Sequence, residues 1–249
     1  MSRHALVAGV SSTDSVGWRC ARALATSGHH VTVTCRRHRL GAVRVAASAE
    51  GFDVVMVDVD EPDSLQALRA LPVVDAVVHA LVAVPDEVLA GPLTDVAREA
   101  FEGVLSRSAW SLGAVVGAVR PQLEASEAGR VVTLSSGLAE STSDHYHVAG
   151  IAKAALEAAA RYLAWELGPA GIAVNVVRFG LVDTPGARAT LGDAVCEGTR
   201  THMARKAPLR SAVTADEVAA QVAWLAGGEV HQVTGQILTV DAGFSLSYF

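Results

Sequence analysis

The sequence is poor in the residues that build disulfide frameworks, metal sites and membrane spans. Its three cysteines, Cys20, Cys35 and Cys196, are far apart and form no CxxC pair, so we expect reduced, buried thiols. Nine histidines are scattered without an HExxH or comparable spacing, which predicts no metal site. No apolar run reaches the roughly 18 residues of a membrane span, and a strand-like run begins too early to leave room for a signal peptide. We therefore expect a cytoplasmic protein without a membrane partner.

Positive charge is also in short supply. The chain has 20 Lys and Arg residues against 26 Asp and Glu residues, a formal net charge of −6, so no basic surplus is available to bind a nucleic acid. The 51% of hydrophobic residues excludes a disordered chain and is enough for one sizeable core. Lysine and tyrosine are scarce: the lysines are Lys153 and Lys206, and the tyrosines are Tyr146, Tyr162 and Tyr248. A mechanism that needs a tyrosine close to a lysine therefore has few candidates.

Short β-branched runs alternate with longer stretches of helical periodicity. Strands are predicted at residues 5–10, 31–35, 53–57, 75–79, 130–134, 173–178 and 236–240. Helical segments are predicted near residues 16–27, 39–49, 63–71, 93–123, 145–167 and 214–226. This alternation predicts right-handed βαβ crossovers, and continuous apolar runs are typical of parallel strands buried on both faces. The predicted fold class is α/β: one doubly wound, Rossmann-type domain over residues 1–249, with a parallel sheet of about seven strands.

Two further expectations concern the surroundings of this sheet. Ligands of a doubly wound fold bind beyond the carboxyl ends of the strands. Residues 183–213, the longest stretch without a predicted strand, follow such an end and are a candidate substrate lid. Tyr162 and Trp165 fall at core-like spacing in the predicted helix 145–167, so we expect both side chains to be packed.

A glycine-containing turn follows the first predicted strand. Residues 9–17 read GVSSTDSVG and lead into a helix. Gly9 lets the chain turn tightly, and Ser15 and Val16 stand where the backbone N–H groups of a helix N-terminus attract an anion such as a pyrophosphate. The motif is not GxGxxG, and an ordinary βα turn with Ser15 as helix cap is the alternative interpretation.

The second predicted strand ends in a run of cations, Cys35-Arg36-Arg37-His38-Arg39. A dinucleotide fold that prefers NAD usually places Asp or Glu here to hold the ribose 2′-hydroxyl. Arg36 and Arg37 suit a 2′-phosphate instead, so the sequence predicts NADPH as the cofactor over NADH. The alternative is that both are surface arginines of an arginine-rich chain.

Tyr146 and Lys153 are the candidate pair for catalysis. They are seven residues apart at the start of a predicted helix, nearly two turns, so their side chains share one face. A nearby ammonium lowers the pKa of a phenol, which makes the tyrosine a better proton donor near neutral pH. Hydride reduction of a simple or conjugated carbonyl needs such a group at the oxygen.

Together these motifs resemble those of the short-chain dehydrogenase/reductases, and most of all the enoyl-ACP reductase branch. The resemblance rests on GVSSTDSVGW, on the Tyr-x6-Lys pair in YHVAGIAK, on GLVDT and on VDAGFS, and it runs from residue 5 to about residue 246. Tyr-x6-Lys is specific, because most of the superfamily uses Tyr-x3-Lys, and Ala149 holds that commoner tyrosine position here. The resemblance implies that Tyr146 polarises the substrate oxygen or donates a proton, that Lys153 binds the nicotinamide ribose and lowers the pKa of the tyrosine, and that the chain forms a homotetramer.

The resemblance also implies a set of cofactor contacts along one edge of the sheet. They are Gly9, Ser15 and Val16 at the pyrophosphate, Asp58 and Val59 at the adenine, Ala80, Leu81 and Val82 at the nicotinamide-side ribose, and Val182 and Thr184 at the carboxamide.

Three positions depart from the enoyl reductase pattern. Ser136 lies ten residues before Tyr146, where enoyl reductases carry an aromatic residue and ketoreductases carry a catalytic serine. Val82 replaces a glycine and Leu181 replaces a proline, whereas Ser108 matches the enoyl branch. The predicted site is therefore a hybrid of the two.

These residues are consistent with two enzymatic reactions and with one non-catalytic function. The first is NADPH-dependent reduction of an enoyl thioester or a related conjugated carbonyl, either a small molecule or carrier-bound, with Tyr146 at the oxygen. The alternative is a ketoreductase that uses Ser136 and Tyr146 on a polyketide or 3-ketoacyl carbonyl. The third is an NADP-binding sensor, against which the presence of both Tyr146 and Lys153 argues, because a sensor needs no phenol.

Overall fold

A sheet of seven parallel strands forms the centre of the molecule. The computed structural model describes residues 3–81, 84–89, 91–143, 146–227 and 232–246, and its strand order is β3-β2-β1-β4-β5-β6-β7. The strands are β1 (Arg3–Ala8), β2 (His29–Cys35), β3 (Asp53–Met56), β4 (Ala76–His79), β5 (Arg130–Ser136), β6 (Ala173–Phe179) and β7 (Ile237–Val240). All seven predicted strands and the predicted fold class are confirmed, because apolar β-branched runs mark strands that are buried on both faces.

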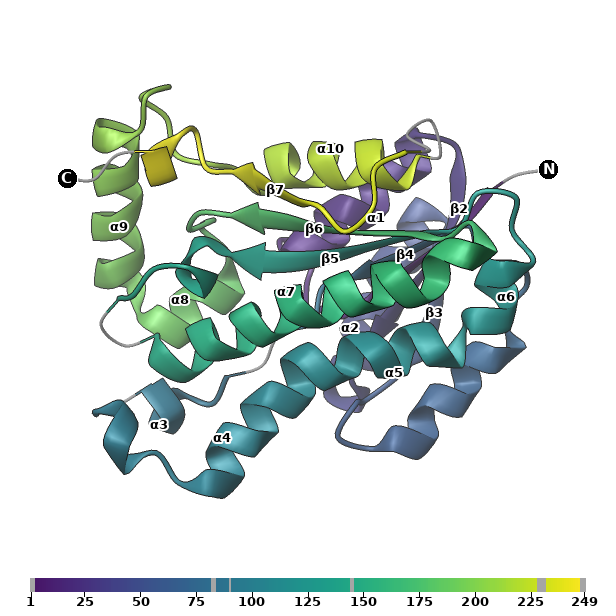
Figure 1. Ribbon diagram of the computed structural model, residues 1–249, viewed down its shortest axis with the longest axis horizontal. Helices are drawn as coiled ribbons and strands as arrows, with labels where there is room; N and C mark the ends of the chain where they lie inside the picture. The colour runs from purple at the N-terminus through teal and green to yellow at the C-terminus, as the bar shows by residue number, and fades with distance from the viewer. Residues whose placement is uncertain (1–2, 82–83, 90, 144–145, 228–231, 247–249) are drawn as a thin grey trace.

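Helices cover both faces of this sheet (Figure 1). On one face, α1, α2 and α10 share a core with Val7; on the other, α5, α6 and α7 share a core with Leu6, its neighbour on β1. The strand order reverses between β1 and β4, and in a doubly wound fold the crevice that binds ligands lies beyond the carboxyl ends of the strands at such a reversal. The helix bounds are α1 (Val16–Thr26), α2 (Leu40–Glu50), α3 (Asp86–Leu89), α4 (Arg98–Leu105), α5 (Ser111–Ala118), α6 (Arg120–Glu124), α7 (His147–Leu167), α8 (Pro185–Leu191), α9 (Asp193–Lys206) and α10 (Ala215–Ala226).

The continuous helix predicted over 93–123 is wrong. The structure divides it into a 3₁₀ turn (Leu93–Asp95), α4, a π-helical turn η4 (Ser106–Trp110), α5 and α6. Val119 leaves the helical conformation (φ −113°, ψ 13°) just before Pro121, which has no N–H for the preceding turn. The predicted helix 63–71 is a 3₁₀ helix, η2 (Pro62–Ala70). Among the described residues, no helix combines the length and apolar character of a membrane span.

The segment predicted as a lid consists of two helices at the carboxyl edge of the sheet. Figure 1 shows α8 and α9 at the end toward which the β5 and β6 arrows point. In α9, Cys196 and Met203 are buried, and the end of the Met203 side chain packs against Gly180, directly after β6. Cys20, Cys35 and Cys196 are all buried free thiols, as predicted.

The expectation that Tyr162 and Trp165 are packed is wrong. Their side chains are 79% and 86% exposed, and Trp110 is 48% exposed at the end of η4. The core side of α7 is instead filled by Leu156, Ala160, Ala164 and Leu167, whose spacing puts Tyr162 and Trp165 on the opposite face.

Candidate active site

The turn after β1 lies directly against the segment that follows β4. Gly9 has φ +104°, and a Cβ there would lie 2.9 Å from the carbonyl C and O of Ala80 and 2.9 Å from Leu81 Cδ2. A Cβ at Gly17, in the first turn of α1, would lie 3.3 Å from Ala80 Cβ. The structure thus brings the predicted residues Gly9, Ala80 and Leu81 together at the crevice, and glycine is required for the approach.

Ser15 caps the N-terminus of α1. Its Oγ accepts a hydrogen bond from Trp18 N at 3.3 Å and donates one to Ser12 O at 2.7 Å. The capping interpretation of Ser15 is therefore confirmed, and Val16 is the first residue of the helix. The capping role of Ser15 is compatible with a pyrophosphate site, because the N-terminus of a capped helix still favours an anion.

Arg36 and Asp58 meet beyond the ends of β2 and β3. Arg36 Nε lies 3.7 Å from Asp58 Oδ1, a loose ion pair, and the same carboxylate oxygen accepts a hydrogen bond from Asp60 N at 3.1 Å. Arg37 begins an exposed 3₁₀ turn, η1 (Arg37–Arg39), and Val59 is buried beside Asp58. The residues predicted for the adenine end therefore gather at one place in the fold.

Ser136 and Tyr146 come together from either side of the loop between β5 and α7. Ser136 ends β5 and its Oγ accepts a hydrogen bond from Leu138 N at 3.3 Å. Tyr146 precedes the first residue of α7 and has a non-helical backbone (φ −139°, ψ 12°). The two segments are held close by Gly150, since a Cβ there would lie 2.7 Å from Leu138 O and its N–H donates to Tyr146 O at 2.7 Å.

Burial controls the acidity of Tyr146. It raises the pKa of the phenol above its ordinary value, and the opposing influence is a hydrogen bond with the Ser136 side chain. The predicted lowering of this pKa by Lys153 is wrong, because desolvation dominates. Tyr146 is therefore a protonated phenol, and a potential donor, at neutral pH.

Lys153 is a buried cation under β5. Its Nζ donates to Leu134 O at 2.9 Å, and burial lowers its pKa to about 8 although Glu157 acts in the other direction. His79, at the end of β4, is also buried. Its ring nitrogens are hydrogen-bonded, Nδ1 with Thr133 Oγ1 at 3.0 Å and Nε2 with Ser111 Oγ at 2.9 Å. Burial and the charge of Lys153 lower the pKa of His79 to about 3, so the imidazole is neutral.

Sequence reasoning missed a buried ion pair next to Lys153. Arg178 on β6 donates from Nε and Nη2 to the two carboxylate oxygens of Glu157 on α7, at 2.9 and 2.7 Å. Ser135 Oγ donates to Glu157 Oε1 at 2.6 Å, and Arg178 also pairs with Glu140, after β5, at 2.6 Å. A charged residue inside the strand AVNVVRF was the available signal, because such a residue needs a partner.

The remaining predicted residues lie at the same edge or outside the described residues. Val182 follows β6 and is buried in the core, and Thr184 caps α8, with its Oγ1 accepting from Ala187 N at 3.1 Å. Val82 lies outside the described residues. In η4, Ser108 Oγ is buried and has no hydrogen-bond partner among the described residues. No cluster of three or more potential metal ligands occurs among the residues that the structure describes.

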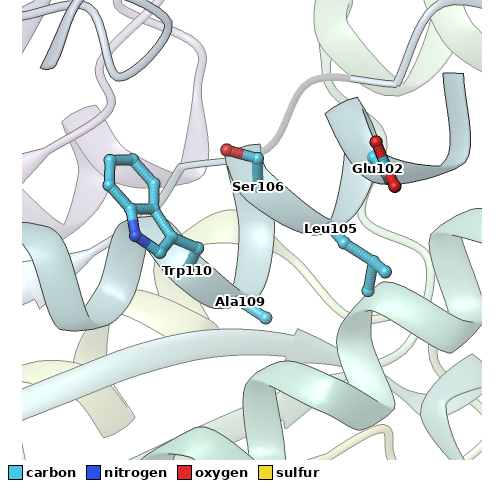
Figure 2. Close-up of a pocket in the computed structure, with 5 residues that line it drawn as sticks. All are labelled: Glu102, Leu105, Ser106, Ala109 and Trp110. Atoms are coloured by element: carbon cyan, nitrogen blue, oxygen red, sulfur yellow. The ribbon is translucent and has the colours of Figure 1, made fainter. Parts of the chain in front are cut away.

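A separate hollow lies on the outer surface of α4 and η4. Figure 2 shows its lining residues, Glu102, Leu105, Ser106, Ala109 and Trp110. None of the predicted catalytic or cofactor-binding residues lines it, so this hollow is distinct from the candidate active site.

A doubly wound parallel sheet with a tyrosine and a lysine at its carboxyl edge defines the short-chain dehydrogenase/reductases, and the chain is an oxidoreductase of this class. Within the class, the model of the enoyl-(acyl carrier protein) reductase family matches residues 9–245, and the chain belongs to this family. The resemblance drawn from the motifs is therefore confirmed.

Three relatives illustrate the similarity. The enoyl-[acyl-carrier-protein] reductase [NADH] FabI of Synechocystis sp. is 30% identical, over 98% of this chain and 96% of the relative. The crystal structure of the enoyl-[acyl-carrier-protein] reductase (NADH) of Aquifex aeolicus has a TM-score of 0.93 at 29% identity, and covers 99% of this chain and 98% of that chain. The Bacillus cereus enoyl-acyl carrier protein reductase, solved with NADP+ and an indole naphthyridinone, has a TM-score of 0.93 at 28% identity, with the same coverage of 99% and 98%.

Proposed function

We propose that this chain reduces the carbon–carbon double bond of a trans-2-enoyl thioester whose acyl group is held on a carrier protein. The Tyr146–Lys153 pair carries the proposal, because Tyr146 precedes α7 and Lys153 lies nearly two turns further along. In enoyl reduction the hydride acceptor is the β-carbon, which lies two bonds further from the oxygen than in ketone reduction. A tyrosine set one turn further from the lysine suits this longer separation, and the printed names of the relatives support the same reaction.

Each residue of the pair has a defined task. A bound nicotinamide supplies the hydride. Tyr146 keeps its proton at neutral pH because burial raises its pKa, and it hydrogen-bonds the thioester oxygen as negative charge develops there. Lys153 gives one of its three N–H groups to Leu134 O, which leaves two for the ribose hydroxyls.

The residues at the carboxyl edge of the sheet fit a dinucleotide. A side chain at Gly9 would strike the backbone of Ala80, so only glycine fits in this turn, and we assign the backbone N–H groups at the start of α1, which follows the turn, to the pyrophosphate. The further contacts that we assign are Ser15 and Val16 at the pyrophosphate, Asp58 and Val59 at the adenine, Ala80, Leu81 and Val82 at the nicotinamide-side ribose, and Val182 and Thr184 at the carboxamide.

We assign NADPH as the preferred cofactor. Arg36 and Arg37 follow β2, where a 2′-phosphate is held in this fold, and Arg37 is exposed. The ion pair of Arg36 with Asp58 is loose, at 3.7 Å, so the guanidinium is free to turn to a phosphate. Two of the relatives are named as NADH enzymes and one was solved with NADP+, so the cation run of this chain supplies the argument for NADPH.

A ketoreductase is the second candidate function. The hydrogen bond between the Ser136 and Tyr146 side chains places two hydroxyl groups where a ketone oxygen would be held. Ser136 departs from the aromatic residue of the enoyl reductase pattern and matches the catalytic serine of ketoreductases, which is why this observation favours a ketone.

A two-by-two assay separates these proposals. The rate of NADPH or NADH oxidation is measured with a trans-2-enoyl thioester and with a 3-ketoacyl thioester of the same chain length. We expect turnover of the enoyl substrate alone, with kcat/KM at least about tenfold higher for NADPH, because an arginine contact to the 2′-phosphate contributes roughly 1.5–3 kcal/mol. Turnover of the ketone alone would establish the second candidate. Saturable cofactor binding with neither substrate consumed would favour a sensor.

We assign a homotetramer as the assembly. The outward face of α7 carries Tyr162 and Trp165, 79% and 86% exposed, and Trp110 borders the hollow of Figure 2. Exposed aromatic side chains are typical of subunit interfaces. Light scattering should give four times the chain mass of 25.7 kDa, and Tyr162→Lys with Trp165→Lys should lower it. A wild-type mass equal to one chain would contradict this assignment.

A further inference from the structure

Glu157 is a buried carboxylate one helical turn beyond Lys153. Residues four apart on a helix are neighbours on its surface, so the carboxylate of Glu157 and the ammonium of Lys153 are natural ion-pair partners. Both side chains are buried, where such a pair would be strong. Yet no ion pair within 4 Å joins these two residues, and Lys153 Nζ donates to Leu134 O instead.

Arg178 and Ser135 explain why Glu157 and Lys153 stay apart. Ser135 on β5 and Arg178 on β6 are register partners, so both side chains reach the same face of the sheet, under α7. The guanidinium occupies both oxygens of Glu157, at 2.9 and 2.7 Å, and the serine hydroxyl adds a bond of 2.6 Å to one of them. Both oxygens of the Glu157 carboxylate therefore accept hydrogen bonds from side chains of the sheet.

The same guanidinium reaches the loop that carries Ser136 and Tyr146. Arg178 Nη1 lies 2.6 Å from an oxygen of Glu140, four residues after Ser136. A buried ion pair is weak evidence for stability, because desolvation of the charges offsets their attraction. The arrangement is more readily explained by what it does to the neighbouring lysine.

We propose that Arg178 is a positioning residue: it holds the Glu157 carboxylate and thereby keeps the Lys153 ammonium unpaired and directed to Leu134 O and the cofactor ribose. The ribose contact rests on the proposed function, whereas the separation of Glu157 from Lys153 does not. Three charged or titratable side chains act on one another around Lys153, namely Glu157 on α7, Arg178 on β6 and His79 on β4. The pKa of His79 is lowered to about 3, so this imidazole is neutral at neutral pH, and the charged group that acts on Lys153 is Glu157, which Arg178 holds.

The scarcity of lysine makes a direct test possible. Labelling with ¹³Cε-lysine gives two side-chain signals, from Lys153 and from Lys206 at the end of α9, whose signal serves as the internal reference. In the wild-type protein without cofactor, Lys153 should titrate at about 8. In Arg178→Met, Glu157 loses its cationic partner and keeps only the hydrogen bond from Ser135, so its charge acts more strongly on Lys153 and the pKa of Lys153 should rise toward the ordinary lysine value of about 10.4.

Two further variants separate positioning from simple loss of structure. Glu157→Gln should move the pKa of Lys153 below the wild-type value, because the carboxylate acts to raise it. The double variant, Arg178→Met with Glu157→Gln, should return to near the wild-type value, since both charges are gone. If Arg178 only maintained the local fold, Lys153 would become solvated and keep a raised pKa in the double variant as well, and this outcome would overturn the proposal.

A matched control and a binding measurement complete the test. Arg120 also bridges two glutamates, Glu124 and Glu166, at 2.7 Å each, but on the exposed surface, so Arg120→Met should leave the titration of Lys153 unchanged. NADPH should bind Arg178→Met roughly tenfold more weakly and bind the double variant within about threefold of wild type. An Arg178→Met protein in which Lys153 still titrates at the wild-type pH refutes the inference. Because the titration needs no substrate, this result is independent of whether the enoyl thioester is turned over.

Discussion

Tyr146→Phe is expected to lower kcat by about 10²–10⁴-fold while the dissociation constant of NADPH stays within about twofold of wild type. The substitution removes one oxygen and leaves the ring. The backbone of residue 146 still accepts from Gly150 N, so the start of α7 and the cofactor crevice are unchanged. The lost group is the phenol that is protonated at neutral pH because burial raises its pKa. Steady-state kinetics with the enoyl thioester and a fluorescence titration with NADPH measure the two quantities.

Tyr162→Phe is the matched control for this experiment. It makes the same chemical change within α7, on the face that points away from the sheet and the candidate active site, and it keeps the aromatic ring, so kcat should be unaffected. A Tyr146→Phe enzyme that keeps more than about a tenth of the wild-type kcat would show that another group serves the oxygen. Its neighbour Ser136, which is partly exposed, would then be the first candidate, because its side chain hydrogen-bonds the phenol.

The parts of the molecule that depend on one stretch of sequence could be predicted. The strands were recognisable because a run such as AVVH in β4 is buried on both faces and contains no polar side chain before its last residue. Tyr146 and Lys153 were recognisable because their spacing is local to a single helix and both residue types are scarce in this chain. Gly9 was recognisable as a tight-turn residue because it follows the first strand directly and precedes a helix, although an ordinary βα turn was the alternative interpretation.

The features that depend on tertiary contacts could not be predicted. The ion pair of Glu157 and Arg178 depends on the register of β5 with β6 and on the placement of α7 over both strands. The spacing of residues within one segment predicts neither of these. The exposure of Tyr162 and Trp165 depends on which face of α7 meets the sheet. The acidity of Tyr146 was predicted with the wrong sign, because a nearby ammonium was considered and the desolvation of the phenol was not.

Gly9→Ala should remove NADPH binding and destabilise the fold, for two separable reasons. The residue has φ +104°, a conformation that costs an alanine about 1–2 kcal/mol. Its new Cβ would also lie 2.9 Å from the carbonyl carbon and oxygen of Ala80. These are backbone atoms of the segment after β4, so they cannot rotate away as a side chain could. Overpacking of this kind costs a further 1–3 kcal/mol or so, and it falls on the turn that faces the pyrophosphate. Urea unfolding and calorimetric titration with NADPH measure the two effects.

Gly28→Ala supplies the comparison that isolates the close approach. Gly28 has a similar φ of +88°, between α1 and β2, but a Cβ there meets nothing within 4 Å. It should therefore show the conformational cost alone and bind NADPH within about twofold of wild type. Equal losses of unfolding free energy in the two variants would show that the contact of the β1–α1 turn with Ala80 does not require glycine. Equal NADPH affinities would show that the pyrophosphate does not lie in this crevice. A Gly9→Ala protein that folds yet binds NADPH at least about a hundredfold more weakly than Gly28→Ala would locate the dinucleotide at the reversal of strand order between β1 and β4.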